Sequence, residues 1–277
     1  MEPVFYASLV RVLVVIPTYN EADNIERMLS RVREILPDAE VLVVDDGSPD
    51  GTADLVEKAA VTLGGVSLLR RAGKSGLGSA YRAGFAWGLE RGYEAFVEMD
   101  ADFSHDPAAL PALLEPLEGG HEVSIGSRYI PGGAIPNWSW HRHLLSWGAN
   151  RYASVVLGLG VADSTAGFRA YAASILRRLD VAQVRAEGYG FQIEMTYRSK
   201  QAGASIVEVP IRFVDREVGQ SKMSMAIVVE ALGLVAYWGL GRLVAPVRRL
   251  LGARTAGVPG RAGLRASPTE RQGGRGA

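Results

Sequence analysis

The chain has 277 residues, of which 48% are hydrophobic and 22% charged, so it is not a globally disordered protein and is long enough for one large domain or two small ones. Lys and Arg number 30, as do Asp and Glu, and this balance gives no argument for a nucleic-acid partner. Cysteine is absent, which excludes disulfides and thiolate chemistry and fits a reducing compartment. No signal peptide is expected, because no basic stretch precedes the short apolar run near the N-terminus.

Strands alternate with helices through the first hundred residues. The strands are expected at 10–16, 40–46, 66–70 and 94–102, with helices at 24–36, from Ala53, and at 79–91. The run at 10–16 is β-branched and almost wholly apolar, which is typical of a strand buried on both faces. Each crossover is long enough for a right-handed βαβ unit, so the sequence predicts an α/β fold with a doubly wound, mostly parallel sheet flanked by helices.

The second half of the chain is less regular. It is expected to contain strands at 122–129 and 204–214, a Pro/Gly/Trp loop at 130–140, a helix through 150–157, and the segment 164–171 leading into another helix. We divide the chain into a domain over 1–222, a C-terminal amphipathic helix over 223–251, and a disordered basic tail over 252–277.

Acidic side chains follow two of the expected strands, at the edge where parallel sheets bind ligands. Asp100 and Asp102 would project to one side of a regular strand, and a divalent cation would relieve their repulsion. Mg²⁺ or Mn²⁺ suits carboxylate oxygens and bridges them to substrate phosphates. A solvated turn is the alternative for this pair. Asp45 and Asp46 fit either a nucleoside contact or ordinary turn chemistry.

The glycine-rich turns do not match the common nucleotide-binding fingerprints. Gly73-Lys74-Ser75 lacks the first glycine of a P-loop, because Leu68 stands at that position. Gly76-x-Gly78 lacks the third glycine of a dinucleotide site, where Tyr81 stands. These glycines are expected to permit tight turns, and a Rossmann oxidoreductase is disfavoured.

Eight motifs occur in order over about residues 11–224, and together they resemble the inverting family 2 glycosyltransferases with a GT-A fold. The closer similarity is to the polyprenol (dolichol) monophosphate mannose synthases. The resemblance implies transfer of mannose from GDP-mannose to a polyprenyl phosphate. UDP-glucose or another nucleotide-sugar stays open as the donor, and a non-catalytic nucleotide-sugar binding module is the alternative class. The motifs are VVIPTYNEADNI, VVDDGSPDGT, GKSGLGSAYRAG, EMDADFSHDP, IGSRYIPGG, STAGFRAY, GYGFQIEM and DREVGQSKM.

The resemblance also implies roles for individual residues. Those at matching positions are Pro17, Tyr19 and Glu21 for the base pocket, Val44 and Asp46 for the nucleoside, Asp100, Ala101 and Asp102 for the metal and diphosphate, Arg128, Arg216 and Lys222 for the phosphates, and Arg169 for the acceptor phosphate. Arginine suits such positions because its fork matches phosphate geometry. The expected catalytic residues are Asp102, Arg128, Arg169, Arg216 and Lys222.

The chain departs from the family pattern at Ser104, a position where close members of the family often carry Gln. Serine is a shorter and weaker ligand, so a water completes the coordination or the metal affinity is lower. Asp100, Asp102 and Ser104 are therefore the expected ligands of Mg²⁺ or Mn²⁺. His105, next to an Asp-Pro pair, is more often structural.

A lipid acceptor implies contact with a membrane surface, and the protein is expected at the cytoplasmic face as a peripheral protein, with a membrane-protein partner as an open alternative. A group of indole and basic side chains suits the headgroup layer. Core packing is the alternative for Trp147. The 223–251 segment either lies in the interface or closes the domain. The group comprises Trp138, Trp140, His141, Arg142, His143 and Trp147.

Overall fold

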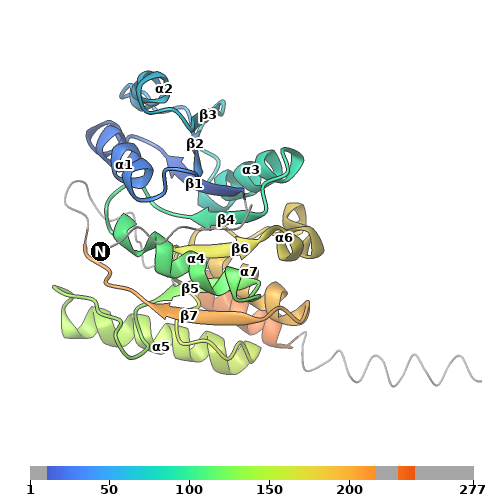
Figure 1. Ribbon diagram of the computed structural model, residues 1–277. Helices are drawn as coiled ribbons and strands as arrows, with labels where there is room; N and C mark the ends of the chain where they lie inside the picture. The colour runs from blue at the N-terminus through green and yellow to red at the C-terminus, as the bar shows by residue number, and fades with distance from the viewer. Residues whose placement is uncertain (1–10, 216–229, 241–277) are drawn as a thin grey trace, which may run out of the picture. The chain divides into compact units, whose positions relative to one another are not determined.

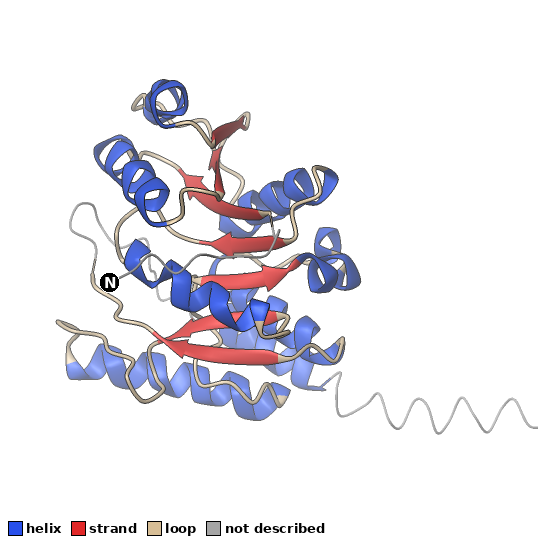
Figure 2. Cartoon of the chain, viewed as in Figure 1, coloured by secondary structure: helices blue, strands red, loops and turns tan. Residues whose placement is uncertain are grey.

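The computed structural model describes residues 11–215 and 230–240. Seven strands form one sheet in the order β3-β2-β1-β4-β6-β5-β7, which Figure 1 shows from top to bottom. β6 runs antiparallel to both of its neighbours, and the other pairings are parallel (Figure 2). The strands are β1 (Val12–Thr18), β2 (Glu40–Asp45), β3 (Val66–Arg70), β4 (Ala95–Glu98), β5 (Val123–Ser127), β6 (Arg169–Ala172) and β7 (Ile206–Pro210).

Helices cover both faces of this sheet, as the doubly wound prediction requires. They are α1 (Ala22–Ile35), α2 (Thr52–Leu63), α3 (Leu77–Glu90), α4 (Leu110–Glu118), α5 (Trp140–Leu157), α6 (Ala173–Leu179) and α7 (Gly188–Gln201), with short 3₁₀ turns at η1 (Pro107–Ala109) and η2 (Val181–Gln183). Residues 230–240 are also helical.

The alternation of side chains along β1 divides the core into two parts. Leu13 and Val15 belong to a cluster with residues of α3, α6 and α7, whereas Val14 and Ile16 belong to a second cluster with residues of α1, α2 and α4. All four side chains are fully buried, which confirms a central strand with two covered faces.

Two glycines allow α3 to lie directly against the sheet. A Cβ at Gly84 would overlap Val15, and one at Gly88 would overlap Leu13 and Phe96. The close packing of α3 on β1 therefore depends on the absence of side chains on this face of the helix.

The structure corrects two expectations about the strands. The segment 164–171 does not lead straight into a helix, because Arg169–Ala172 forms strand β6 between β4 and β5, and α6 follows. The fourth strand ends at Glu98, before Asp100. Strand alternation therefore does not orient Asp100 and Asp102, and the loop that follows β4 places them.

The strand order reverses between β1 and β4, since β2 and β3 extend from one side of β1 and the remaining strands extend from β4. At such a switch point the loops after neighbouring strands turn away from each other and leave a crevice. PTYNE covers the end of β1 and the residues after it, and DADFSHD follows β4; these are the acidic and aromatic motifs that the sequence singles out. The fold thus predicts the position of the site.

Candidate active site

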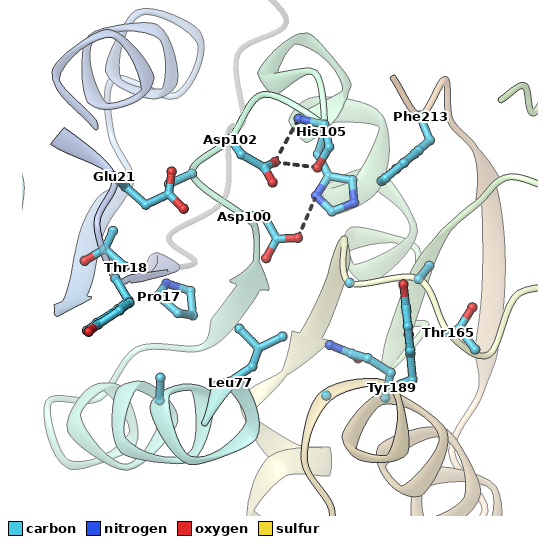
Figure 3. Close-up of a pocket in the computed structure, with 18 of the residues that line it drawn as sticks. Pro17, Thr18, Glu21, Leu77, Asp100, Asp102, His105, Thr165, Tyr189 and Phe213 are labelled. Carbon is cyan, nitrogen blue, oxygen red and sulfur yellow. Dashed lines mark hydrogen bonds and ion pairs between the residues drawn. The ribbon is translucent and has the colours of Figure 1, made fainter. Parts of the chain in front are cut away.

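A pocket of about 510 Å³ opens at this switch point (Figure 3). Segments that follow β1, β2, β3, β4 and β5 contribute to it, together with α5, the loop before β6, and α7. Eight of the expected site residues, and Ser104 besides, line the pocket: Pro17, Tyr19, Glu21, Asp46, Asp100, Ala101, Asp102 and Arg128.

Asp100 and Asp102 lie next to each other in the middle of Figure 3. The Asp102 side chain is buried, and its Oδ1 accepts hydrogen bonds from the backbone N–H of Ser104 at 3.0 Å and from its hydroxyl at 2.6 Å. Asp100 is more open, with its side chain 31% exposed, and its Oδ2 lies 4.0 Å from Nδ1 of His105. Ser104 therefore orients Asp102, and its expected role as a metal ligand stays a prediction.

His105 does not supply positive charge to this pair. Burial lowers the pKa of His105 to about 4, although the charge of Asp102 opposes the shift. Its ring stacks on Phe168 and meets Phe213 edge to face. The imidazole is therefore neutral near pH 7 and packs against these two aromatic rings beside Asp100.

One wall of the pocket consists of residues from the parallel half of the sheet, which we call the nucleotide wall: Pro17, Tyr19, Glu21, Asp46 and Lys74. Asp46 Oδ2 accepts a hydrogen bond from the backbone N–H of Ser75 at 3.0 Å, and Arg71 forms an ion pair with Oδ1 at 3.0 Å. Lys74 lies 4.7 Å from the centre of the Tyr19 ring, within the range of a cation–π contact.

Asp45 and Val44 do not line this pocket. Asp45 accepts hydrogen bonds from Thr18 and from Ser48, so it stabilises the turn, whereas Asp46 faces the pocket. Val44 is fully buried in the core that β2 shares with α3. The side chain of Val44 therefore lies away from the pocket, and its expected contact with the nucleoside stays a prediction.

The opposite wall, which we call the acceptor wall, is formed by Arg128, Trp138, Arg142, Thr165 and Tyr189. Arg128 is only 7% exposed, and its guanidinium forms a two-pronged pair with Asp163, from Nε at 2.6 Å and from Nη2 at 2.7 Å. Nη2 also donates to Thr165 at 2.8 Å. This leaves Nη1 as the guanidinium nitrogen outside these bonds.

The Arg128–Asp163 pair is buried and strongly coupled. Burial alone would lower the pKa of Arg128, but the charge and hydrogen bonds of Asp163 outweigh it and raise that pKa. Burial likewise acts to raise the pKa of Asp163, and Arg128 outweighs it and lowers that pKa. Both groups are therefore charged at neutral pH, and Arg128 is a fixed cation on this wall.

Arg142 is a second cation on the acceptor wall. The sequence predicted a contact of Arg142 with lipid headgroups and did not predict its position in the pocket. Its Nη1 pairs with Asp215 at 3.0 Å, and its guanidinium lies 3.9 Å from the centre of the Trp138 ring. Trp138 itself donates to Asp215 at 2.9 Å. Trp138 and Arg142 therefore form part of the pocket, and the spacing of aromatic and basic residues was the only signal of it.

Arg169 lies inside the protein and not at the acceptor wall. It is fully buried, and it donates to the backbone carbonyls of Ala166, Ser164 and Gln192 and to the Thr196 hydroxyl. Its guanidinium thus joins β6, the preceding loop and α7. This corrects the expectation that Arg169 contacts the acceptor phosphate, because the side chain is fully buried and bonded to groups of the fold. Arg216 and Lys222 lie outside the described residues.

The outer surface of α5 carries large apolar side chains. Trp140 is 77% exposed and Trp147 49%, so Trp147 is not a core residue. The helix at 230–240 contributes Ala231 and Val235 to the core and leaves Tyr237 exposed. Within residues 11–215 and 230–240, no helix is both long and apolar enough to cross a membrane.

The fold, with an acidic pair at its switch point, is that of a glycosyltransferase, and comparison with known proteins agrees. The family model for glycosyl transferase family 2 matches residues 13–180, and this chain belongs to that family. The resemblance inferred from the eight motifs is thus confirmed.

Three relatives show which members of this family the chain is similar to. The chain is 50% identical to the undecaprenyl-phosphate mannosyltransferase of Micrococcus luteus over 87% of its own length and 99% of that protein. It is also 50% identical to the polyprenol monophosphomannose synthase of Mycolicibacterium smegmatis, over 84% and 89%. Identity to the dolichol-phosphate mannosyltransferase of Pyrococcus furiosus is 37%, over 80% of this chain and 62% of that protein.

Solved structures support the fold. Glucosyl-3-phosphoglycerate synthase of Mycobacterium tuberculosis, in complex with phosphoglyceric acid, superposes with a TM-score of 0.60 at 19% identity, over 82% of this chain and 79% of that one. Mannosyl-3-phosphoglycerate synthase of Rubrobacter xylanophilus superposes with a TM-score of 0.59 at 18% identity, over 90% and 79%. The predicted α/β architecture with a mostly parallel sheet is confirmed.

Proposed function

We propose that this chain transfers mannose from GDP-mannose to a polyprenyl phosphate and uses Mg²⁺ or Mn²⁺. The observation that carries the proposal is 50% identity over 87% of the chain to a relative named for mannosyl transfer to undecaprenyl phosphate. The pocket is consistent with this proposal. Asp100 and Asp102 lie between the two walls, at what we call the floor, and offer carboxylates for a metal-bound nucleotide, whereas the acceptor wall holds two arginines.

The reaction balances without a general base. An oxygen of the lipid phosphate forms a bond to C1 of mannose, the bond from C1 to the β-phosphate oxygen breaks, and the electron pair leaves with GDP. A phosphate monoester has its second pKa near ~6, so the attacking oxygen is already anionic at neutral pH. Proton removal from the nucleophile is therefore not required of any side chain.

The donor set fits a hard divalent cation. Asp100 and Asp102 offer carboxylate oxygens on one side of the pocket, and the part of the chain described here contains no group of three acidic, His or Cys residues that would enclose a metal alone. Mg²⁺ is commonly bound by one or two carboxylates together with substrate phosphates. The cation, when bound, stabilises the charge that develops on the departing diphosphate.

The acceptor wall provides the complementary charge for the lipid phosphate. Arg128 is held rigidly by Asp163, and Arg142 by Asp215, so both guanidinium groups are oriented before substrate binds. Preorganised cations hold two anionic substrates together at a lower entropic cost than mobile ones do. Arg216 and Lys222 are proposed to contact the diphosphate of the donor.

The exposed apolar surface of α5 supports the proposal that this wall lies near a membrane. Trp140, Leu144 and Trp147 are large exposed apolar side chains of the helix that also carries Arg142. Tryptophan favours the headgroup level of a bilayer. We propose that binding through α5 brings the pocket to the polyprenyl phosphate at the membrane surface.

A donor panel tests the proposal. Turnover with polyprenyl phosphate is measured with GDP-mannose, GDP-glucose, UDP-glucose and UDP-mannose in Mg²⁺ or Mn²⁺. GDP-mannose is expected to give a kcat/KM at least about 100-fold above the others, since a buried pocket discriminates hydrogen-bonded analogues strongly. A preference for a UDP-sugar would reject the donor assignment, and no turnover with any donor would reject the acceptor.

A further inference from the structure

The loop that carries Tyr19 and Glu21 into the pocket is held by side chains of a second loop. Three consecutive backbone N–H groups, at residues 20–22, donate to side-chain oxygens at the end of β2 and the start of α2. We call this second segment, residues 45–52, the clasp. Each of the three bonds is 3.0 Å long and joins residues 28 or 31 positions apart, so the clasp fixes the backbone on both sides of Glu21.

The accepting hydroxyl groups of the clasp are themselves oriented by carboxylates. The Ser48 hydroxyl donates to Oδ1 of the buried Asp45 at 2.6 Å. The Thr52 hydroxyl is fully buried and donates to Oδ1 of Asp50 at 2.6 Å. Because each hydroxyl gives its proton to a carboxylate, its lone pairs are left to accept from the loop. The bonds to the loop run from Asn20 N–H to Ser48 Oγ, from Glu21 N–H to Thr52 Oγ1, and from Ala22 N–H to Asp50 Oδ2.

Asp50 serves the N-termini of two helices. Its Oδ2 accepts from Ala22, the first residue of α1, and its Oδ1 accepts from the backbone N–H of Thr52, the first residue of α2, at 3.0 Å. Such N–H groups have no partner within their helix and favour a negative charge. Slight burial acts to raise the pKa of Asp50, but hydrogen bonds from Thr52 and Ala22 outweigh it and lower that pKa. The two helices therefore begin at one shared anion.

The loop needs this support because its backbone is strained. Asn20 has a φ of 58°, in the left-handed region that is uncommon for residues other than glycine. Such a conformation costs free energy and persists only where the surrounding structure over-determines it. Asn20 lies between Tyr19 and Glu21, which both line the pocket, and Figure 3 shows Glu21 directed towards Asp100 and Asp102. The turn at Asn20 thus sets the direction of the side chains on either side of it.

We infer that Ser48, Asp50 and Thr52 are positioning residues for the nucleotide of the donor, which hold the loop in its pocket-lining conformation before the nucleotide binds. The inference rests on the proposed function. None of the three is among the described residues that line the pocket, so they act through Tyr19 and Glu21. A loop that is ordered in advance lowers the entropic cost of binding. Loss of the clasp therefore weakens binding of the donor and leaves the acceptor wall unchanged.

The test compares Thr52→Val, which keeps the shape of the side chain but not its hydroxyl, with Thr52→Ser, which keeps the hydroxyl. Thr52→Val is expected to raise the Kd for GDP with Mg²⁺, measured by calorimetry, and the KM for GDP-mannose about tenfold, whereas kcat and the KM for the lipid phosphate stay within about twofold. Thr52→Ser is expected to bind GDP within about threefold of wild type. A merely structural role would lower the folded fraction, and hence kcat, without this selective rise.

Thr62→Val is the matched control, because Thr62 is an exposed residue of the same helix whose hydroxyl donates to the carbonyl of Lys58. It is expected to leave the Kd for GDP unchanged. Ser48→Ala removes a second bond of the clasp at a partly exposed position, and it decides the question if Thr52→Val does not fold. Its Kd for GDP is expected to rise about threefold or more.

Three results would overturn the inference: a Kd for GDP within twofold of wild type in the folded variants, an equal rise in the KM for both substrates, or binding by Thr52→Ser as weak as by Thr52→Val. Failure of the proposed function is distinct, because the wild-type protein would then not bind GDP. If it bound UDP instead, the donor assignment would fail, and the same comparison made with UDP would still decide the inference. Binding of neither nucleotide would reject both.

Discussion

The two walls of the pocket are built in different ways. The nucleotide wall comes from loops after the parallel strands β1, β2 and β3, and its Asp46 is held by a backbone N–H of the next loop and by Arg71. The acceptor wall lies beside the antiparallel strand β6, and its Arg128 is held by a buried carboxylate 35 residues further along the chain.

This difference determines how each wall responds to change. Loops at parallel strand ends are positioned by the sheet itself, so a substitution there removes a contact with the ligand and leaves the fold in place. A buried ion pair supports both the fold and the site, since loss of one partner leaves an uncompensated charge. Damage on the nucleotide wall should therefore be mainly kinetic, and damage on the acceptor wall both kinetic and structural.

The largest effect is expected at the floor between the walls. Asp102→Asn removes a carboxylate charge next to the diphosphate, and kcat should fall by about 10³-fold or more, as for the loss of other groups that stabilise transition-state charge. Asp106→Asn in the same loop is the matched control, because Asp106 is exposed and caps η1. Turnover of Asp102→Asn within tenfold of wild type would contradict the metal assignment.

Asp163→Asn should separate the acceptor wall from the nucleotide wall by its effect on stability. It leaves Arg128 without its buried partner, so the free energy of unfolding should fall by about 3–5 kcal/mol in denaturant titrations. Because the fold lowers the pKa of Asp163, this contribution is present at neutral pH and is lost only as the pH falls below ~4.

The matched control for that variant is Glu122→Gln, which breaks the more exposed pair with Arg178. It should cost much less stability, since exposed ion pairs contribute little. Equal losses for the two variants would show that the Arg128–Asp163 pair has no special role in the acceptor wall.

Cations on the two walls should affect different substrates. Lys74→Met is expected to raise KM for the nucleotide-sugar about tenfold, and Arg142→Gln to raise KM for the lipid phosphate about tenfold, each the loss of one charge contact of about 1.4 kcal/mol. Steady-state kinetics with each substrate varied in turn would test this. A reversed pattern, or equal effects on both substrates, would show that the walls are wrongly assigned.

The smallest effect is expected on the outer surface of α5. Replacing Trp140 and Trp147 by Ser should weaken binding to anionic phospholipid vesicles several-fold in sedimentation assays, because both indoles are exposed. Turnover of a short, water-soluble acceptor should stay within twofold of wild type. If vesicle binding did not change, α5 would not be the membrane contact.

The sequence predicted the nucleotide wall more completely than the acceptor wall, for a physical reason. Pro17, Asp46 and Asp100 lie at or just after the ends of parallel strands whose apolar runs are easily recognised, and the ends of such strands meet at one edge. Strand β6 has only four residues and follows a turn, so its pattern was too short to distinguish from a helix start. Without β6, the inward position of Arg169 could not be inferred.

Contacts between residues that are distant in the sequence could not be predicted either. Asp163 pairs with Arg128, and Gln192 with Glu98 across 94 positions, and no local motif encodes such contacts. Lys74 stands in a glycine-rich turn that matches neither a P-loop nor a dinucleotide pattern, so no local motif assigns it to the site. Its contact with Tyr19 appears only once β1 and β3 are placed in one sheet.

The most direct test of the central claim is transfer of radiolabelled mannose from GDP-mannose to a polyprenyl phosphate, with Mg²⁺ or Mn²⁺ present or removed by chelator. Label should enter the lipid phase with the cation and not with the chelator, and re-addition of the cation should restore it. Label that enters the lipid phase equally in chelator would contradict a metal site at Asp100 and Asp102, and the absence of lipid-linked label under every condition would contradict the proposed reaction itself.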